Sequence, residues 1–289
     1  MKKTLFRIFK RILIFLLIVL AIAGGILAYN MWLNQTFVTT FYTVTTDKDI
    51  ENMRIVELSD LHLREYGEKN ADLVERIRNL KPDIIAVAGD MNIDENPDYT
   101  VVLELMEQLV EIAPVYYGPG NHEWAGIYGW HYSAMADDIA ATGAHFLLQQ
   151  YEDVEINGNK LRIGGIFEWP REQLEWPNSQ KVVDALDAQK QDTSDVYTIL
   201  ICHCPELFYT SLQNVQVDLA ISGHAHGGLV RLPHTDGLWS TNQGFLPKYT
   251  SGVRQIGEST VVISRGLGDS EPYPRIFNQP ELVVIDIEK

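Results

Sequence analysis

Apolar residues along the chain follow three patterns, and each pattern predicts a different kind of segment. Residues 12–29 form an 18-residue stretch without a charge, which as a helix is about 27 Å long and close to the thickness of a bilayer's hydrocarbon core. Short runs rich in β-branched residues predict strands, at 53–58, 83–88, 114–117, 196–202 and 217–221. Apolar positions three and four apart predict helices, at 70–80 and near 99–112.

The order of these segments predicts the fold class. Strands and helices alternate in the first half, which is typical of an α/β fold whose strands end at a common edge. The second half is richer in strands, with a hairpin expected over 154–163 around Asn157-Gly158 and closing strands at 261–264 and 282–287. About 250 residues follow the N-terminal segment, enough for one large domain with a substantial core.

The N-terminal segment carries a strong charge signal. Five basic residues and no acidic one precede the apolar stretch, so the positive-inside rule keeps this end in the cytoplasm and sends the rest outside. We expect residues 1–31 to be a single-pass cell-membrane anchor, with the domain that follows it extracytoplasmic. The alternative is a cleavable signal peptide, for which Ala21-Ile22-Ala23 offers a cleavage site. Residues 32–50 are expected to form an extended stalk and lead-in, and 51–289 the domain.

The charge balance excludes one class of partner. The net charge is −16, and beyond the basic N-terminus 18 basic residues face 39 acidic ones. Such a body has no basic stripe for a phosphate backbone, so we expect no nucleic-acid polymer as partner. Phosphorylated substrates would also be repelled unless bound cations reversed the local charge. The two cysteines, Cys202 and Cys204, are too close in sequence for a favourable disulfide.

Residues suited to binding metals recur where predicted strands end. They comprise five imidazoles, two carboxylates and one carboxamide, a donor set that suits two divalent ions such as Mn, Fe, Zn, Ni or Co. Two donors at positions i and i+2 of an extended chain point the same way, so each such pair is expected to reach one cavity. The set comprises Asp60, His62, Asp90, Asn121, His122, His203, His224 and His226.

These segments resemble the calcineurin-like metallophosphoesterase superfamily, whose pattern is D-x-H, G-D, G-N-H-E, H and G-H-x-H in this order. The resemblance spans about residues 53–288 and implies a four-layer α/β/β/α sandwich of two mixed sheets flanked by helices. It implies that Asp90 bridges two metal ions, that His122 is the general acid, and that Glu123 orients His122 or a ligand. It assigns the remaining ligands to a first metal, held by Asp60, His62 and His226, and a second, held by Asn121, His203 and His224.

The resemblance also implies an activity: hydrolysis of a phosphoester or pyrophosphate bond by metal-activated water. It is closest to a membrane-associated bacterial branch that includes UDP-2,3-diacylglucosamine pyrophosphatase-like and exported phosphohydrolases, which favours a lipid-linked or small envelope substrate. The alternatives are a nucleotide or cyclic-nucleotide phosphodiesterase and a non-catalytic metal-stabilised binding module or scaffold.

Several further residues have a second interpretation besides ordinary packing. Trp124, Tyr128 and Trp130, in the loop after Gly120-Asn121-His122-Glu123, could form an apolar wall for a lipid or nucleobase. Glu168 stands where many relatives have Asp, and Arg64 and Arg265 could contact a second phosphate. The remaining histidines lie outside the pattern and are expected at ordinary surface or core positions: His131, His145 and His234.

Overall fold

The computed structural model describes residues 2–93, 98–128, 134–191, 195–232, 236–240, 243–269 and 275–289. Two short 3-10 helices are present, η1 (Glu68–Asn70) and η2 (Pro205–Tyr209). The α-helices are α1 (Lys2–Leu33), α2 (Ala71–Leu80), α3 (Thr100–Val110), α4 (Asn121–Tyr128), α5 (Met135–Ala141) and α6 (Pro177–Gln191).

Two six-stranded mixed sheets form the body, and a two-stranded sheet lies beside them. The first sheet has the order β1 (Val38–Thr45), β14 (Glu281–Glu288), β2 (Met53–Leu58), β3 (Ile84–Val87), β4 (Val115–Tyr117) and β5 (His145–Phe146). The second has the order β12 (Gly252–Ile256), β13 (Ser259–Ile263), β9 (Leu219–Ser222), β8 (Val196–Cys202), β7 (Asn159–Ile166) and β6 (Gln150–Ile156). The small sheet pairs β10 (Trp239–Ser240) with β11 (Gly244–Phe245).

Strand direction determines where the site forms. In the first sheet β2, β3, β4 and β5 are parallel, and in the second β7, β8, β9 and β13 are parallel. Their carboxyl ends therefore gather at one end of each sheet, where an α/β sheet places its functional loops.

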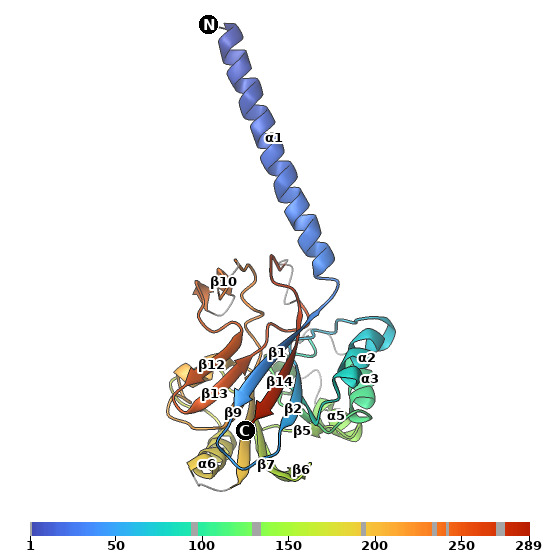
Figure 1. The fold of residues 1–289 in the computed structure, drawn as a ribbon, viewed down its shortest axis with the longest axis vertical. Coiled ribbons are helices and arrows are strands. Elements are labelled where there is room, and N and C mark those ends of the chain that lie inside the picture. The colour runs from blue at the N-terminus through green and yellow to red at the C-terminus, as the bar shows by residue number, and fades with distance from the viewer. Residues whose placement is uncertain are drawn as a thin grey trace.

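Alternate residues of each central strand face opposite sides of the sheet, and both sides are buried. On β2, Ile55 packs between the two sheets, whereas Val56 and Leu58 pack under α2 and α3. On β8, Ile199 lies between the sheets and Leu200 packs under α6. In Figure 1, α2, α3 and α5 cover one outer face and α6 covers the other. The predicted four-layer α/β/β/α architecture is confirmed.

Most elements expected from the apolar pattern are present with small shifts at their ends. Strands β2 and β8 have the expected bounds, and the hairpin of β6 and β7 turns at Asn157-Gly158. The segment expected to be a stalk is extended, but residues 38–45 also pair along their whole length with β14 as edge strand β1. Thr-rich β1 alternates exposed and half-buried positions, a weak pattern typical of an edge strand.

Helix α1 projects from one end of the body (Figure 1). Within the described residues it is the one helix that is long and apolar enough to cross a membrane, and its apolar side chains are exposed on all sides. A permanent anchor and a signal segment share these properties. The helix continues through Leu33, two residues beyond the expected boundary.

Candidate metal centre

The strand ends of both sheets bring the predicted donors together. Asp60 and His62 follow β2, Asp90 follows β3, and Asn121 and His122 begin α4 just after β4. The second sheet contributes its donors from the ends of β8 and β9, and these are His203, His224 and His226. Residues far apart in sequence therefore share one cluster, as do His62 and His226, which are separated by 164 positions.

The first donor group consists of Asp60, His62 and His226, whose donor atoms all lie within 4.8 Å of one another. The Nε2 atoms of His62 and His226 are 3.2 Å apart, and Oδ1 of Asp60 is 3.4 Å from Nε2 of His226. Two ring nitrogens facing each other with a carboxylate between them are an arrangement that one cation can satisfy at once.

The second donor group consists of Asp90, His203 and His224. Nε2 of His203 lies 3.0 Å from Oδ2 of Asp90 and 3.2 Å from Nδ1 of His224. The other ring nitrogen of His203, Nδ1, is 2.6 Å from the carbonyl oxygen of Ala88. Because a carbonyl only accepts, Nδ1 carries the proton and directs Nε2 toward the group.

Asp90 links the second group to the first, and His122 lies beside Asp90. Asp90 also forms a cluster of donors with His62 and His122, and Nε2 of His122 is 3.8 Å from Oδ2 of Asp90. The side chain of His122 is partly exposed, so it can meet a molecule from outside. The backbone N–H of His122 donates to Oδ1 of Asp90 at 2.9 Å, which fixes the start of α4 against this carboxylate.

Five of the seven predicted ligands adopt a left-handed backbone conformation: φ is 50° at Asp60, 49° at His62, 53° at Asp90, 70° at His224 and 47° at His226. The D-x-H and H-x-H donors come together as expected, but they do so from left-handed turns and not from an extended chain. A positive φ is uncommon outside glycine and persists only where the surroundings fix it, often at functional sites. Here sharp turns just after the strands aim the side chains inward.

Two glycines let the chain approach the ligand carboxylates closely. A Cβ atom on Gly120 would lie 2.2 Å from Oδ1 of Asp90, and one on Gly223 would lie 2.3 Å from Oδ2 of Asp60. Any side chain at either position would displace a carboxylate, which explains why glycine precedes both the N-H-E and the H-x-H segments.

The buried charges shift the pKa values of the donors in opposite directions. Burial lowers the pKa of His62 to about 4 and that of His224 to about 3. Burial alone would lower the pKa of His203, but the charges of Asp90 and Asp60 outweigh it and raise that pKa to about 10. Burial likewise opposes ionisation of Asp90, yet His203 holds its pKa well below the usual range. The cluster thus combines neutral imidazoles with an ion pair whose proton a divalent cation would replace.

Glu123 holds the backbone turn that carries Asp90. Its buried carboxylate accepts the backbone N–H groups of Asp90 (2.7 Å) and Gly120 (2.8 Å) at one oxygen. The other oxygen accepts Met91 N–H (2.8 Å), Asn92 N–H (3.1 Å) and the hydroxyl of Tyr117 (2.9 Å). Glu123 therefore shapes the turn that carries Asp90, and so it orients a predicted ligand through the backbone.

A buried donor atom supports the fit of the cluster to metal ions. Among the described residues, Oδ1 of Asn121 is buried without a hydrogen-bond partner. Such orphaned polar atoms need an explanation in a native structure, and an absent ion is one. For Asn121 the orphan is the carboxamide oxygen, the atom that the resemblance assigns to a metal.

Sequence reasoning missed Arg275 and Asn278. Arg275 is fully buried, and its Nη2 lies 3.0 Å from Nδ1 of His226. Asn278 donates to the carbonyl oxygen of His226 at 2.6 Å. Neither belongs to a recognisable motif, and a buried arginine has no local pattern in sequence that distinguishes it from an exposed one.

Several other candidates have structural roles. Glu168 is buried and accepts the backbone N–H groups of Glu175 and Trp176 at 3.1 and 3.0 Å. Arg64 pairs with Asp269 and Arg265 pairs with Glu281. His145 pairs with Glu152. Both cysteines are free, as expected.

The proposed apolar wall is described only in part. Trp124 lies on α4 rather than in a loop, and it packs against Phe167 and Trp176 with ring centroids 5.3 Å away in each case. Trp130, His131, His234 and the side chain of Tyr128 lie outside the described residues.

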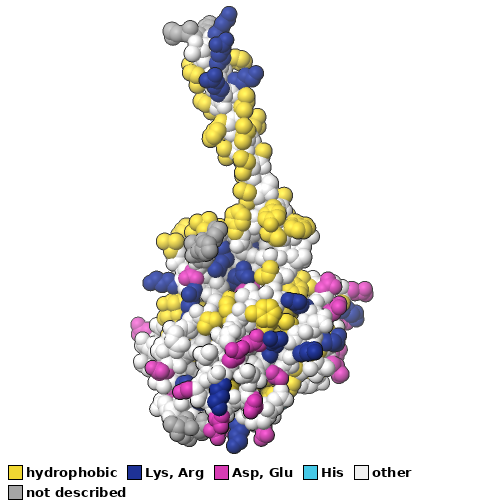
Figure 2. All heavy atoms as spheres, viewed as in Figure 1, with side chains coloured by type: hydrophobic (Ala, Val, Ile, Leu, Met, Phe, Trp, Pro, Cys, Tyr) yellow, Lys and Arg dark blue, Asp and Glu magenta, His cyan; other side chains and the backbone are white. Residues whose placement is uncertain are grey.

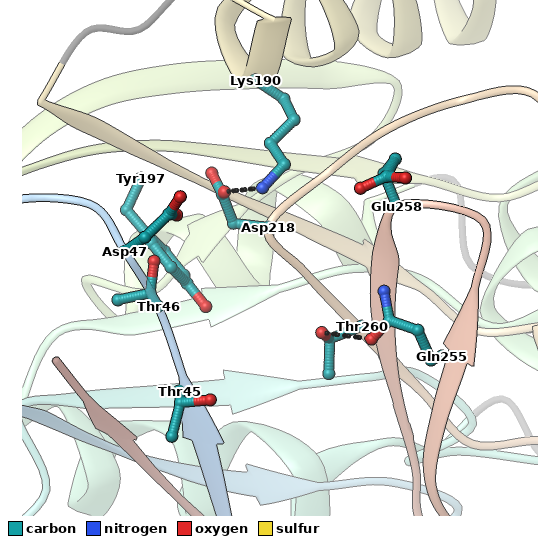
Figure 3. Close-up of a pocket in the computed structure, with 9 residues that line it drawn as sticks. All are labelled: Thr45, Thr46, Asp47, Lys190, Tyr197, Asp218, Gln255, Glu258 and Thr260. Carbon is teal, nitrogen blue, oxygen red and sulfur yellow. Dashed lines mark hydrogen bonds and ion pairs between the residues drawn. The ribbon is translucent and has the colours of Figure 1, made fainter.

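A hollow of about 460 Å³ (Figure 3) is lined by residues at the amino ends of β8, β9 and β13, whereas the metal donors follow the carboxyl ends of the parallel strands. Its floor is the buried carboxylate of Asp218, which pairs with Lys48 at 2.8 Å and Lys190 at 2.7 Å. The same carboxylate accepts the N–H and hydroxyl of Thr198 at 2.8 and 2.7 Å. With its lone pairs satisfied in this way, Asp218 ties α6 and the lead-in to β2 onto the second sheet.

Replacement of Asp218 by Asn is expected to lower the free energy of unfolding by about 2–4 kcal/mol, since it leaves two buried or half-buried lysines unpaired. These cationic partners lower the pKa of Asp218 despite its burial. The contribution is therefore fully present above the unfolded pKa of about 4 and is lost as pH falls through the lower pKa of the folded state. Denaturant unfolding of the full chain in detergent at pH 7 and at about pH 2 measures both effects.

The matched control is Asp153→Asn, which removes an exposed partner of Arg162. It should change stability by less than about 1 kcal/mol. An Asp218→Asn protein as stable as this control at pH 7 would contradict the structural role.

A sandwich of two mixed sheets with His and Asp donors clustered at the strand ends defines an α/β protein with a candidate metal centre. The calcineurin-like phosphoesterase family matches residues 53–228, more than half of the chain, and the chain belongs to this family.

The chain is similar over most of its length to proteins described as uncharacterized metallophosphoesterases. One, YkuE of Bacillus subtilis (strain 168), is 27% identical over 278 residues, covering 92% of this chain and 91% of its own. Another, from Aquifex aeolicus (strain VF5), is 28% identical over 258 residues, covering 86% of this chain and 90% of its own. A Danio rerio protein described as a transmembrane protein with a metallophosphoesterase domain is 24% identical, covering 84% of this chain and 54% of its own.

Among solved structures, a 5'-nucleotidase precursor from Thermus thermophilus aligns with a TM-score of 0.49 and 18% identity, covering 75% of this chain and 50% of its own. A dimetal phosphatase from Danio rerio aligns with a TM-score of 0.43 and 14% identity, covering 76% of this chain and 89% of its own.

Proposed function

We propose that the protein is a membrane-anchored, dinuclear-metal phosphohydrolase that cleaves a phosphoester or pyrophosphate bond of a lipid-linked substrate. The observation that carries the proposal is the pair of adjacent donor groups, which are linked because Asp90 of the second group also clusters with His62 of the first. Asp60, His62 and His226 would hold one ion, with Asp90 between the two sites. Asn121, His203 and His224 would hold the second. Two divalent ions in such a site supply an activated water and neutralise the charge on the phosphate.

The chain's own residues supply position and a proton. His122, partly exposed beside Asp90, is placed to contact the phosphate and to protonate the leaving oxygen. The N–H bond to Asp90 holds the first turn of α4, and so the Cα of His122, in a fixed place. Glu123 in turn holds the Asp90 turn. A non-catalytic metal-stabilised scaffold needs the ligands but has no use for a partly exposed histidine at this position.

The membrane context favours a lipid-linked substrate over a soluble nucleotide. Helix α1 enters the body at the end that carries the donor groups (Figure 1), so an anchored enzyme would keep its site near the bilayer. The Danio rerio relative is described as a transmembrane protein, which supports an anchor in this chain also. The basic N-terminal end of α1 supports an extracytoplasmic domain.

His122→Ala tests the general-acid role. We expect metal content to stay unchanged and kcat to fall by roughly 10²–10⁴-fold, the usual contribution of a positioned acid. The loss should be smallest for leaving groups that need no proton, so a series of aryl phosphates of increasing leaving-group pKa measures it directly. His145→Ala is the matched control, because His145 is half-exposed and far from the donor cluster in its pair with Glu152. An equal loss on every leaving group would remove His122 as the acid.

A further inference from the structure

Helix α1 is joined to the metal-donor end of the body by buried hydrogen bonds. Asn30 and Asn34, one turn apart near the end of α1, are 1% and 8% exposed, whereas the apolar residues before them are exposed. Oδ1 of Asn30 accepts the backbone N–H of Phe277 at 2.6 Å, and Nδ2 of Asn34 donates to the carbonyl oxygen of Arg275 at 2.9 Å. The side chain of Arg275 contacts the His226 ring. A single residue, Arg275, therefore connects α1 with a donor of the first group.

A layer of three segments extends from this junction, and we call it the rim. It consists of residues 229–232, the described parts of 238–246, and 275–277. Backbone bridges join Ile276 to Val230 and Val230 to Trp239, and Trp239 pairs with Phe245. The rim begins directly after Gly227-Gly228, which follow His226 in the chain. It is thus continuous with both α1 and the metal donors.

The rim exposes the two most accessible large apolar side chains of the described body beyond α1, Phe245 and Leu246. Phe245 is 85% exposed and Leu246 is 72% exposed, and Phe277 and Leu232 are about half exposed. Leu246 and Phe277 have φ values of 54° and 52°, a left-handed backbone conformation that is strained for residues other than glycine. Neither side chain is buried in the core. In Figure 2, hydrophobic side chains gather on this end of the body around the base of α1. Exposed apolar clusters of this kind mark interaction surfaces.

The rim lies beside the end of the apolar stretch of α1, where that stretch would meet the membrane–water interface. Tyr29 and Trp32 are exposed at the end of that stretch, and such aromatic residues favour the membrane–water interface. Because Phe277 is bonded to Asn30, the residue after Tyr29, the rim starts at the same level. Exposed Lys248, two residues after Leu246, adds a cation suited to lipid phosphates.

We infer that the rim is a membrane-docking surface whose partner is the lipid bilayer itself. Phe245, Leu246 and Phe277 enter the interfacial region, and the metal centre is held at the level of the lipid headgroups. The site then receives headgroups from the bilayer rather than solutes from bulk water. The inference rests on the proposed function only in taking α1 as a membrane anchor.

Depth measurements on the full chain in phosphatidylcholine–phosphatidylglycerol vesicles test this surface. A nitroxide label is placed on Phe245→Cys or Phe277→Cys, while buried Cys202 and Cys204 remain unlabelled. The control is Glu258→Cys, which is exposed beside the hollow at the far end of the sheets. We expect the rim labels to be accessible to oxygen and protected from an aqueous nickel chelate, and the control label to show the reverse. Rim labels as accessible to the chelate as the control would overturn the inference.

A double variant, Phe245→Ser with Leu246→Ser, tests the consequence for substrates. Turnover of phosphatidic acid in vesicles should fall several-fold, while turnover of soluble p-nitrophenyl phosphate should stay unchanged. An equal fall on both substrates, or no fall on the vesicles, would contradict a docking role. A wild-type protein that hydrolyses neither substrate would remove the proposed function, and the label depths would still decide whether the rim contacts lipid.

Discussion

Asp90→Asn is expected to reduce kcat by roughly 10²–10³-fold, because electrostatic stabilisation by one group in such a site is of this size. The change removes one negative charge at the point where the two donor groups meet. Oδ2 of Asp90 is the oxygen nearest His203, whereas Oδ1 accepts the N–H of His122. Asn keeps an oxygen for His122, so the start of α4 should remain in place.

Metal content separates this effect from misfolding. We expect Asp90→Asn to bind at most one ion per chain, as measured by plasma mass spectrometry on detergent-purified protein, with an unchanged circular dichroism spectrum. The matched control is Asp153→Asn, an exposed carboxylate remote from the cluster. Full activity or two bound ions in the Asp90→Asn protein would contradict a shared position between two metal sites.

Glu123→Gln is expected to act on stability and on metal affinity together. The carboxylate accepts four backbone N–H groups and a hydroxyl, and it does so in a fully buried position. In glutamine an NH₂ group replaces one of the two carboxylate oxygens. The backbone N–H groups on that side then face another donor and lose their acceptor. We expect the free energy of unfolding to fall by about 1–3 kcal/mol, because buried backbone N–H groups lose their acceptor.

Because Glu123 shapes the turn that carries Asp90, the same change should also weaken metal binding by about 10–100-fold. Glu168→Gln provides the matched control, since Glu168 is buried and its carboxylate accepts the backbone N–H groups of Glu175 and Trp176 rather than those of a predicted ligand. It should lower stability without changing metal affinity. Metal titrations of both variants that give the same affinity would show that Glu123 has no influence on the donors.

The features that were predictable from the sequence depend on local patterns that recur along the chain. The buried strands were predictable from their continuous apolar runs, because strands covered on both faces leave no polar positions. The polar residues that follow those runs then indicate the position of the site, because parallel strands end at one edge of the sheet. The ordered set of short motifs supplied the rest, including the four-layer arrangement.

The remaining features depend on contacts between distant segments. The left-handed turns at Asp60 and His226 were not predictable, because Asp and His adopt that conformation more often than most residues but still only rarely. The burial of Arg275 and the pairing of Asn30 with Phe277 arise only when α1 meets a loop near the C-terminus. Strand β1 likewise exists through its pairing with β14, since its own residues have only a weak alternation.

The central claim is that two metal ions bound by this cluster make the chain a phosphohydrolase. The most direct measurement uses the full chain, purified in detergent and loaded with Mn. Bound metal is counted in parallel with the rates of hydrolysis of bis-p-nitrophenyl phosphate and p-nitrophenyl phosphate. We predict about two ions per chain and turnover of at least one of these substrates, with both lost or reduced in Asp90→Asn. A chain that binds no metal, or that turns over substrate equally well after the metal is removed, would contradict this account.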